Sequence, residues 1–214
     1  RGWQRAARRL CCMNKAMNFW DQQFSEEGYK YGTAPNTFLQ SEAHRIAPCS
    51  KVLVPGDGEG RNSVWLAQQG HQVTALDASS VGLQKAKALA VERGVMVHTV
   101  LADLEDWRAD SLFDAVVLTY VHLPPSLRPY AHRCLAQALR TGGVLILEAF
   151  HPLQLGRSSG GPKQTDMLYT LDMLQSDFQD MLEVQLAQEC ETSLDEGSGH
   201  HGPANVTRYI ANRR

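Results

Sequence analysis

The strongest constraint on the fold is a regular alternation that begins at residue 51. Short, apolar, β-branched runs alternate with longer stretches in which apolar residues recur at helical spacing. This alternation is typical of parallel βαβ units. It predicts strands at 51–55, 71–76, 95–101, 113–119 and 144–149, with helices at 61–69, after Ser79 or Ser80, and from Ser126 to the Gly142-Gly143 pair.

The end of the chain departs from that pattern. Residues 151–165 are rich in Gly, Ser and Pro and predict a long loop, which a short helix at 171–178 follows. Two β-like runs, at 182–192 and 205–211, are separated by Gly- and His-containing residues and predict a terminal antiparallel pair. The expected fold is therefore α/β: a doubly wound, mainly parallel, seven-stranded Rossmann-like sheet with an antiparallel C-terminal strand pair.

Length, composition and charge restrict the possible partners. The 214 residues are 43% hydrophobic, which fits one well-buried domain, and no apolar run approaches the roughly 20 residues of a membrane-spanning helix. Residues 1–15 hold five of the 21 basic residues and no acid, so the remainder carries 16 basic and 23 acidic residues, a charge of −7. Because phosphate binding usually needs a basic face, we expect no nucleic-acid partner. Because no apolar run is long enough to span a bilayer, we expect no membrane partner.

The five cysteines indicate a reducing compartment. They are odd in number, and none has Cys-x-x-Cys spacing or zinc-ligand spacing with a histidine. We therefore expect free thiols, no metal site and a cytoplasmic location.

The first expected strand leads directly into a glycine-rich loop, residues 56–60 (Gly-Asp-Gly-Glu-Gly). Glycine allows a sharp turn there and lets a ligand approach the backbone. Dinucleotide sites use Gly-x-Gly-x-x-Gly, whose third glycine would fall at position 61, and this chain has Arg61 there. By itself the loop indicates a nucleotide-like ligand.

Two aspartates follow the next two expected strands. Asp77 lies about twenty residues beyond the glycine loop, where a carboxylate can accept hydrogen bonds from both hydroxyls of a ribose. Asp103 follows the third strand and is suited to the exocyclic amine of an adenine, although it could equally cap the turn into Glu105. Together with the loop, these acids favour an adenosine-containing ligand.

The chain also resembles a known family through several motifs in a fixed order. They are residues 19–24 (Phe-Trp-Asp-Gln-Gln-Phe), 29–36 (Tyr-Lys-Tyr-Gly-Thr-Ala-Pro-Asn), 58–62 (Gly-Glu-Gly-Arg-Asn), 77–79 (Asp-Ala-Ser), 102–104 (Ala-Asp-Leu) and the segment from Phe113-Asp114 to His122-Leu123-Pro124. From residue 17 to about residue 150 the sequence is similar to small bacterial methyltransferases of the tellurite-resistance and thiopurine methyltransferase group.

The resemblance implies a bacterial, cytoplasmic class I enzyme that transfers a methyl group from S-adenosyl-L-methionine to a small-molecule acceptor. Residues 1–16, basic and without acids, are expected to be a disordered extension. A single domain (17–214) follows, with an N-terminal lid and helix (17–50), a cofactor-binding core (51–150), and a substrate loop with the terminal strand pair (151–214). The residues expected to bind the cofactor are Trp20, Tyr31, Gly32, Gly56, Asp57, Gly58, Gly60, Arg61, Asn62, Asp77, Ala78, Asp103, Leu104, Thr119 and Tyr120.

One position departs from the family pattern. Relatives usually carry an acid two residues before the first glycine, where it orients the amino-acid end of the cofactor, and this chain has Val54. Asp57, inside the loop, is the residue that we expect to compensate.

No Ser-His-Asp or metal-ligand arrangement is present in the sequence, which agrees with an in-line displacement that needs mainly positioning. A thiol or another soft nucleophile as acceptor needs no dedicated base. Where a base is needed, His122 at the end of the fourth strand is the expected catalytic residue, ahead of His151 and the His200-His201 pair. Two alternatives stay open: a nicotinamide-dependent oxidoreductase, and a non-catalytic protein that binds S-adenosylmethionine.

Overall fold

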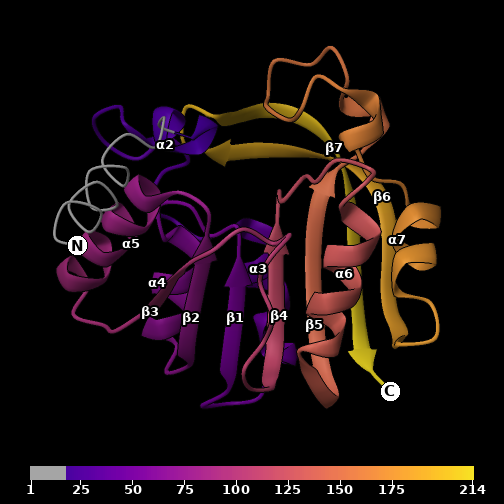
Figure 1. Ribbon diagram of the computed structural model, residues 1–214. Helices are drawn as coiled ribbons and strands as arrows, with labels where there is room; N and C mark the ends of the chain where they lie inside the picture. The colour runs from indigo at the N-terminus through magenta and orange to yellow at the C-terminus, as the bar shows by residue number, and fades with distance from the viewer. Residues whose placement is uncertain (1–17) are drawn as a thin grey trace, which may run out of the picture.

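The computed structural model describes residues 18–214 and places their strands in one seven-stranded sheet with the order β3-β2-β1-β4-β5-β7-β6 (Figure 1). β1 to β5 are mutually parallel, whereas β7 pairs antiparallel with both β5 and β6. The strands are β1 (Lys51–Pro55), β2 (Gln72–Asp77), β3 (His98–Leu101), β4 (Phe113–Thr119), β5 (Leu139–Phe150), β6 (Leu182–Glu196) and β7 (His200–Arg213). The expected sheet, mainly parallel with an antiparallel C-terminal pair, is confirmed.

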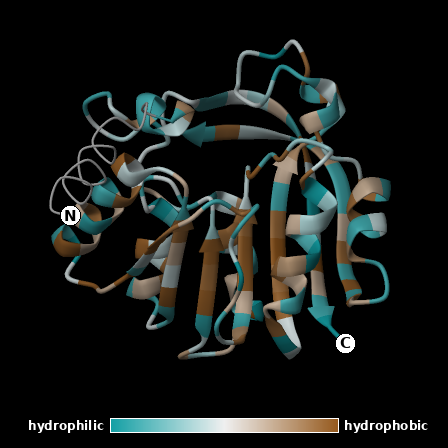
Figure 2. Cartoon of the chain, in the orientation of Figure 1, coloured by the Kyte–Doolittle hydropathy of each residue, from teal (hydrophilic) through white to brown (hydrophobic). Residues whose placement is uncertain are grey.

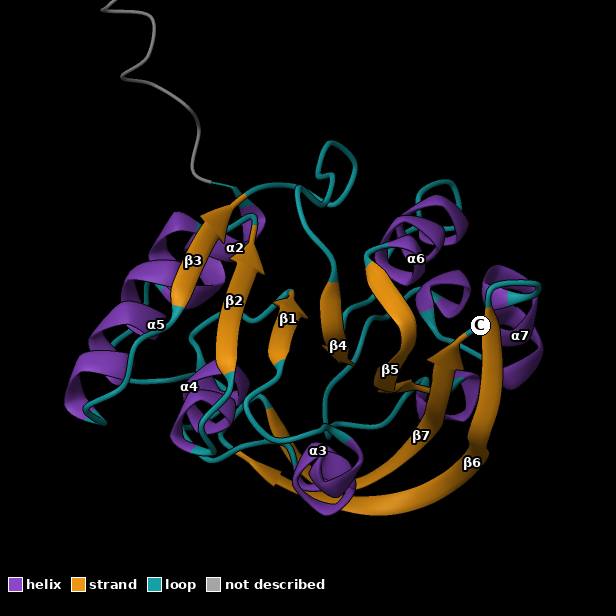
Figure 3. Ribbon diagram, turned by 90° about the horizontal axis from the view of Figure 1, so that it is seen from below, coloured by secondary structure: helices purple, strands orange, loops and turns teal. Residues whose placement is uncertain are grey.

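Helices cover both faces of this sheet (Figure 3). α3, α4 and α5 pack over one face, and α6 and α7 pack over the other. The helices are α2 (Phe19–Phe24), α3 (Thr37–Glu42), α4 (Arg61–Gln68), α5 (Ser80–Glu92), α6 (Arg128–Gln137) and α7 (Leu171–Phe178), with short 3-10 helices η1 (Ala43–Arg45), η2 (Pro152–Gln154) and η3 (Thr165–Met167). Within the described part of the chain, no helix is long and apolar enough to cross a membrane.

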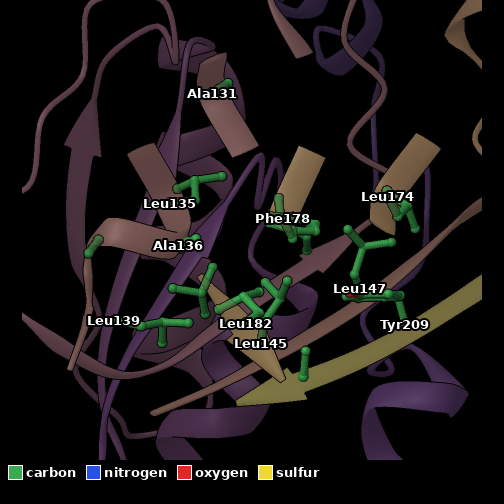
Figure 4. Packing of buried hydrophobic residues seen from close by; sticks show 14 of the residues in the cluster. Ala131, Leu135, Ala136, Leu139, Leu145, Leu147, Leu174, Phe178, Leu182 and Tyr209 are labelled. Atoms are coloured by element: carbon green, nitrogen blue, oxygen red, sulfur yellow. The ribbon is translucent and has the colours of Figure 1, made fainter. Parts of the chain in front are cut away.

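The central strands are apolar on both sides because both faces are covered. Along β1, Leu53 packs into the core beneath α6 and α7, whereas Val52 and Val54 pack against α3 and α4. Figure 4 shows the first of these cores, where Leu135 of α6 and Phe178 of α7 meet strand residues. Hydrophobic colour accordingly concentrates along the central strands in Figure 2.

Most predicted element bounds agree with the structure to within a few residues, with the following exceptions. The third strand is shorter than expected, at His98–Leu101, and lies at the edge of the sheet. The Gly142-Gly143 pair does not end α6; that helix stops at Gln137, and the glycines lie inside β5. Residues 1–16, expected to be an extension, lie outside the described residues.

The terminal strand pair is longer than the sequence predicts. β6 continues to Glu196 and β7 begins at His200, so the hairpin extends well beyond the sheet that its lower half completes. Its upper half crosses over the carboxyl ends of the central strands and reaches the N-terminal segment near α2 (Figure 1). At its tip the Gly199 N–H donates to the Lys30 carbonyl at 3.0 Å. We call this upper part of the hairpin, residues 191–205, the hairpin roof; it covers the carboxyl ends of the central strands (Figure 1).

Candidate functional site

A cavity of about 210 Å³ lies at the carboxyl ends of β1, β2, β3 and β4, beneath the hairpin roof. β1 and β4 are neighbours in the sheet although β2 and β3 separate them in the sequence. This is the switch point of a doubly wound sheet, where such folds bind their ligands. The residues lining the cavity are Trp20, Phe24, Tyr31, Gly56, Asp57, Gly58, Arg61, Asn62, Leu76, Asp77, Ala78, Ala102, Asp103, Leu104, Thr119, Tyr120, Val121, His122, Leu123 and His200.

The glycine loop forms one wall because its glycines permit contacts that no side chain would. Gly56 has φ 63°, and a Cβ there would lie 2.6 Å from Val121 Cγ2. Gly60 has φ 93°, and a Cβ there would lie 2.6 Å from the Ala86 Cα in α5. Gly56 therefore lets the loop lie directly against Val121, and Gly60 lets α4 begin directly against α5.

Asp77 joins this loop to the end of β2. Its carboxylate accepts hydrogen bonds from the Gly58 N–H at 2.8 Å and from the Ser79 N–H at 2.7 Å. Burial raises the pKa of Asp77, and these two N–H groups oppose the shift. A carboxylate offers about four acceptor positions, so two remain for donors from a ligand.

Asp57 has a different environment. Both of its carboxylate oxygens accept from Ser63, one from the backbone N–H at 3.2 Å and the other from the hydroxyl. Burial raises the pKa of Asp57 to about 7, although the Ser63 contacts lower it. Asp57 therefore caps the first turn of α4 while one edge of it reaches the cavity.

The lid predicted for the N-terminal segment lies over the glycine loop and the Asp77 turn. Trp20 stacks on Phe24 with ring centroids 5.6 Å apart. Asp21 of the same helix accepts from the Ser79 hydroxyl at 2.7 Å and from the Val81 N–H at 3.1 Å, which ties α2 to the start of α5. These contacts hold the Trp20 side of the cavity in place.

Glu59 of the glycine loop binds the rest of the lid. It accepts from the Lys30 N–H at 2.8 Å and pairs with Lys85 Nζ at 2.8 Å. The same ammonium donates to the Gly28 carbonyl at 2.7 Å. The segment predicted as a lid, the loop and α5 are thus joined through one partly buried ion pair.

Aromatic rings line the opposite end of the cavity. The His200 ring lies 4.4 Å from that of Tyr31 and 4.5 Å from that of Tyr120. Tyr120 has φ 57°, rare for a residue other than glycine, and its hydroxyl donates to Glu148 at 2.9 Å. Burial lowers the pKa of His200 and, together with the Glu148 charge, raises that of Tyr120 well above its ordinary value. Both rings are therefore neutral at pH 7.

His122 lies at this end with both ring nitrogens engaged by backbone. Nδ1 lies 2.6 Å from the Met167 carbonyl, so it carries the proton, and Nε2 accepts from the Phe150 N–H at 3.2 Å. Burial lowers its pKa to about 4. This geometry fixes a neutral ring that is a weak base, and it disfavours the catalytic role expected from the sequence.

A polar network fills the space between the cavity floor and the hairpin roof. Asn62 donates to the Thr119 hydroxyl at 2.7 Å. Arg61 Nη2 pairs with Glu196 Oε2 at 2.8 Å, which links α4 to the end of β6. The Asn36 amide donates to Glu196 at 3.0 Å and to Glu148 at 2.6 Å.

The structure brings together nearly all residues singled out from the sequence. Of the predicted cofactor residues, only Gly32 and Gly60 do not line the cavity: Gly32 packs against Gly197 of the hairpin tip, and Gly60 against α5. Phe24, Leu76, Ala102, Val121 and Leu123 also line it and are not among the predicted cofactor residues, and so does His200, which the sequence offered only as a candidate base behind His122. Phe24 follows Trp20 at helical spacing, which is a signal for it in the sequence. His200 lies between the two predicted β runs and, in the structure, begins β7.

Comparisons with known proteins agree with this architecture. Residues 52–143 match the family described as a methyltransferase domain. The chain is 30% identical over 115 residues to 2-heptyl-1-hydroxyquinolin-4(1H)-one methyltransferase from Mycobacteroides abscessus, covering 52% of this chain and 51% of that protein. It is 26% identical over 149 residues to thiocyanate methyltransferase 1 from Brassica oleracea, covering 68% of this chain and 59% of that protein. The chain thus spans about half the length of the curated relatives that it matches.

Among solved structures, TehB from Haemophilus influenzae has a TM-score of 0.69 at 19% identity, covering 92% of this chain and 67% of that one. The N-methyltransferase NodS from Bradyrhizobium japonicum, solved with S-adenosyl-L-homocysteine, has a TM-score of 0.67 at 13% identity, covering 92% and 99%. The chain is similar to class I S-adenosylmethionine-dependent methyltransferases. In this methyltransferase fold, the matched segment 52–143 contains the glycine loop, Asp77 and Asp103, and so most of the cavity wall.

Proposed function

We propose that this chain transfers a methyl group from S-adenosylmethionine to a small-molecule soft nucleophile such as a thiol or a thiocyanate-like anion. The observation that carries the proposal is the cavity at the β1–β4 switch point, which combines the glycine loop, Asp77 and a neutral aromatic end. When bound, S-adenosylmethionine supplies a methyl group on a positively charged sulfur.

The residues present fit that donor. Asp77 keeps two acceptor positions for the ribose hydroxyls, and Asp103 lies beside Ala102 and Leu104 on the adenine side of the cavity. Gly56, without a side chain, lets the amino-acid portion approach the backbone. At the other end, the aromatic rings of Tyr31 and Tyr120 suit a sulfonium, because ring faces attract cations.

The aromatic end supports an acceptor that needs no proton removed by the protein. His122 has both ring nitrogens bonded to backbone and a pKa of about 4. His200 has a lowered pKa, and the Tyr120 hydroxyl is a donor to Glu148. These groups orient an acceptor and exclude water, whereas a poorly ionised alcohol would need a stronger base. The similarity to a thiocyanate methyltransferase supports the same class of acceptor.

The test is a methyl-transfer panel with the full chain and isotopically labelled S-adenosylmethionine. Thiols, thiocyanate, selenite, tellurite, amines and hydroxylated aromatics are supplied separately, and S-adenosylhomocysteine and methylated product are measured by mass spectrometry. We expect product with thiols or with the soft anions, and much less with hydroxylated aromatics. Transfer to none of them would contradict methyl transfer, and transfer to the hydroxylated aromatics alone would contradict the soft acceptor.

A further inference from the structure

Arg61 carries an unpartnered donor into the cavity. It is the first residue of α4, is only 7% exposed and lines the cavity. Nη2 pairs with Glu196 Oε2 at 2.8 Å, but the buried Nη1 has no hydrogen-bond partner among residues 18–214. Leaving a buried, charged donor unpaired is costly, so this N–H is expected to meet an acceptor on a ligand.

The acid that pairs with the donor's ammonium group in relatives is absent here, and Asp57 is already engaged by Ser63. Val54, where relatives have an acid, is 1% exposed and belongs to the core beneath α3 and α4. Both carboxylate oxygens of Asp57 face Ser63. The start of α4 beside Arg61 adds the positive end of a helix dipole. The unpaired Nη1 and the start of α4 therefore offer donors to an anionic group at this end.

We propose that Arg61 binds the α-carboxylate of the donor's methionine portion, so that this chain recognises that end through its carboxylate and not through its ammonium group. The proposal rests on the proposed function and explains how the chain tolerates Val54. It also gives the hairpin roof a part in donor binding, because Glu196 at the end of β6 holds the other edge of the guanidinium group.

Glu196 itself is held in position by other contacts. Its Oε1 accepts from Asn36 at 3.0 Å and from the Thr37 N–H at 3.3 Å. Burial would raise the pKa of Glu196, but the neighbouring His200 and Arg61 outweigh it and keep the pKa at about 2. The carboxylate is therefore ionised and orients Arg61, so Glu196 is a positioning residue.

Three ligands distinguish recognition of the carboxylate from recognition of the ammonium group: S-adenosylhomocysteine, its decarboxylated amine analogue, and its deaminated acid analogue. Their dissociation constants are measured by titration calorimetry on the full chain. In the wild type, we expect loss of the carboxylate to weaken binding about 10-fold to 100-fold, the value of a charged hydrogen bond, and loss of the ammonium group to weaken it far less. Arg61→Met should weaken the binding of S-adenosylhomocysteine by the same factor and leave the dissociation constant of the amine analogue unchanged.

Two further variants serve as matched controls. Arg140→Met removes an exposed arginine that pairs with Asp114 away from the cavity, and it should change none of the three constants. Glu196→Gln keeps the shape of the side chain but removes the competing charge, so the preference for a carboxylate should persist or increase. If the Arg61–Glu196 pair had only a structural role, Glu196→Gln would instead weaken the binding of all three ligands by the same factor.

The outcomes separate this inference from the function on which it rests. If wild-type protein binds S-adenosylhomocysteine and the amine analogue equally, Arg61 does not read the carboxylate and the inference is overturned. If Arg61→Met weakens both ligands equally, or fails to fold while the wild type shows no carboxylate preference, the same conclusion follows. If wild-type protein binds none of the three ligands, the proposed function itself fails.

Discussion

Replacing Asp77 by alanine should weaken donor binding strongly while leaving the sheet intact. The carboxylate uses two acceptor positions for the Gly58 and Ser79 N–H groups, and the two that remain are those proposed for the ribose. A hydrogen bond to a charged acceptor contributes about 1.5 kcal/mol or more, so the loss of two corresponds to about 3 kcal/mol, or roughly 100-fold in the dissociation constant. Disorder in the loop, once Gly58 loses its acceptor, would increase this figure.

A ligand cycle isolates the ribose contribution from that disorder. S-adenosylhomocysteine and its 2′-deoxy analogue are titrated by calorimetry against wild type and Asp77→Ala, with Asp110→Ala as a matched change of an exposed aspartate outside the cavity. The missing hydroxyl should cost about 10-fold in wild type and in Asp110→Ala, and nothing in Asp77→Ala. An equal cost in all three proteins would remove Asp77 from the ribose site.

Three other predictions concern the site. The pKa of Asp57 is raised to about 7 in the folded protein, so the contribution of its protonated form to the free energy of unfolding is full below the unfolded pKa near 4 and is lost as pH rises through 7. In denaturant titrations, Asp57→Asn should therefore gain stability relative to wild type between pH 5 and pH 8, by up to about 4 kcal/mol. A difference that stays constant over this range would refute the prediction. The pKa of His122 is lowered to about 4, so its ring signals in an NMR titration should not shift between pH 8 and pH 5.5, and a midpoint near 6.5 would contradict the backbone bonds. Gly56→Ala, which collides with Val121, should destabilise the fold and abolish donor binding, whereas Gly70→Ala, equally left-handed but in open space, should only destabilise it modestly; similar binding in both variants would argue against the collision.

The core of the fold was predictable because its signals are local. The apolar runs at 51–55 and 113–119 are bounded by turn residues, and the structure gives β1 and β4 the same limits. Ser79, expected as a possible cap, does cap α5 by accepting from the Gly82 N–H. Each of these features depends on neighbours a few residues away, which a sequence displays directly.

The roof could not be predicted in the same way. Residues 193–196 have a polar, loop-like composition, and they continue β6 only because β7 pairs with them beyond the edge of the sheet. The roles of Asp57 and His122 were hidden for a related reason. Their partners, Ser63, Met167 and Phe150, are fixed by tertiary packing. No spacing in the sequence therefore indicates that a carboxylate faces inward, or that both ring nitrogens of a histidine are hydrogen-bonded to backbone.

Equilibrium binding of S-adenosylhomocysteine and of NADH to the wild-type chain tests the central claim most directly, because both ligands suit a glycine loop followed by an acid at the end of β2. Titration calorimetry with each ligand, at the same protein concentration and pH, separates the two. We expect one-to-one binding of S-adenosylhomocysteine at micromolar concentration and no measurable binding of NADH. Binding of NADH without binding of S-adenosylhomocysteine would contradict the assignment of this cavity to a methyl donor.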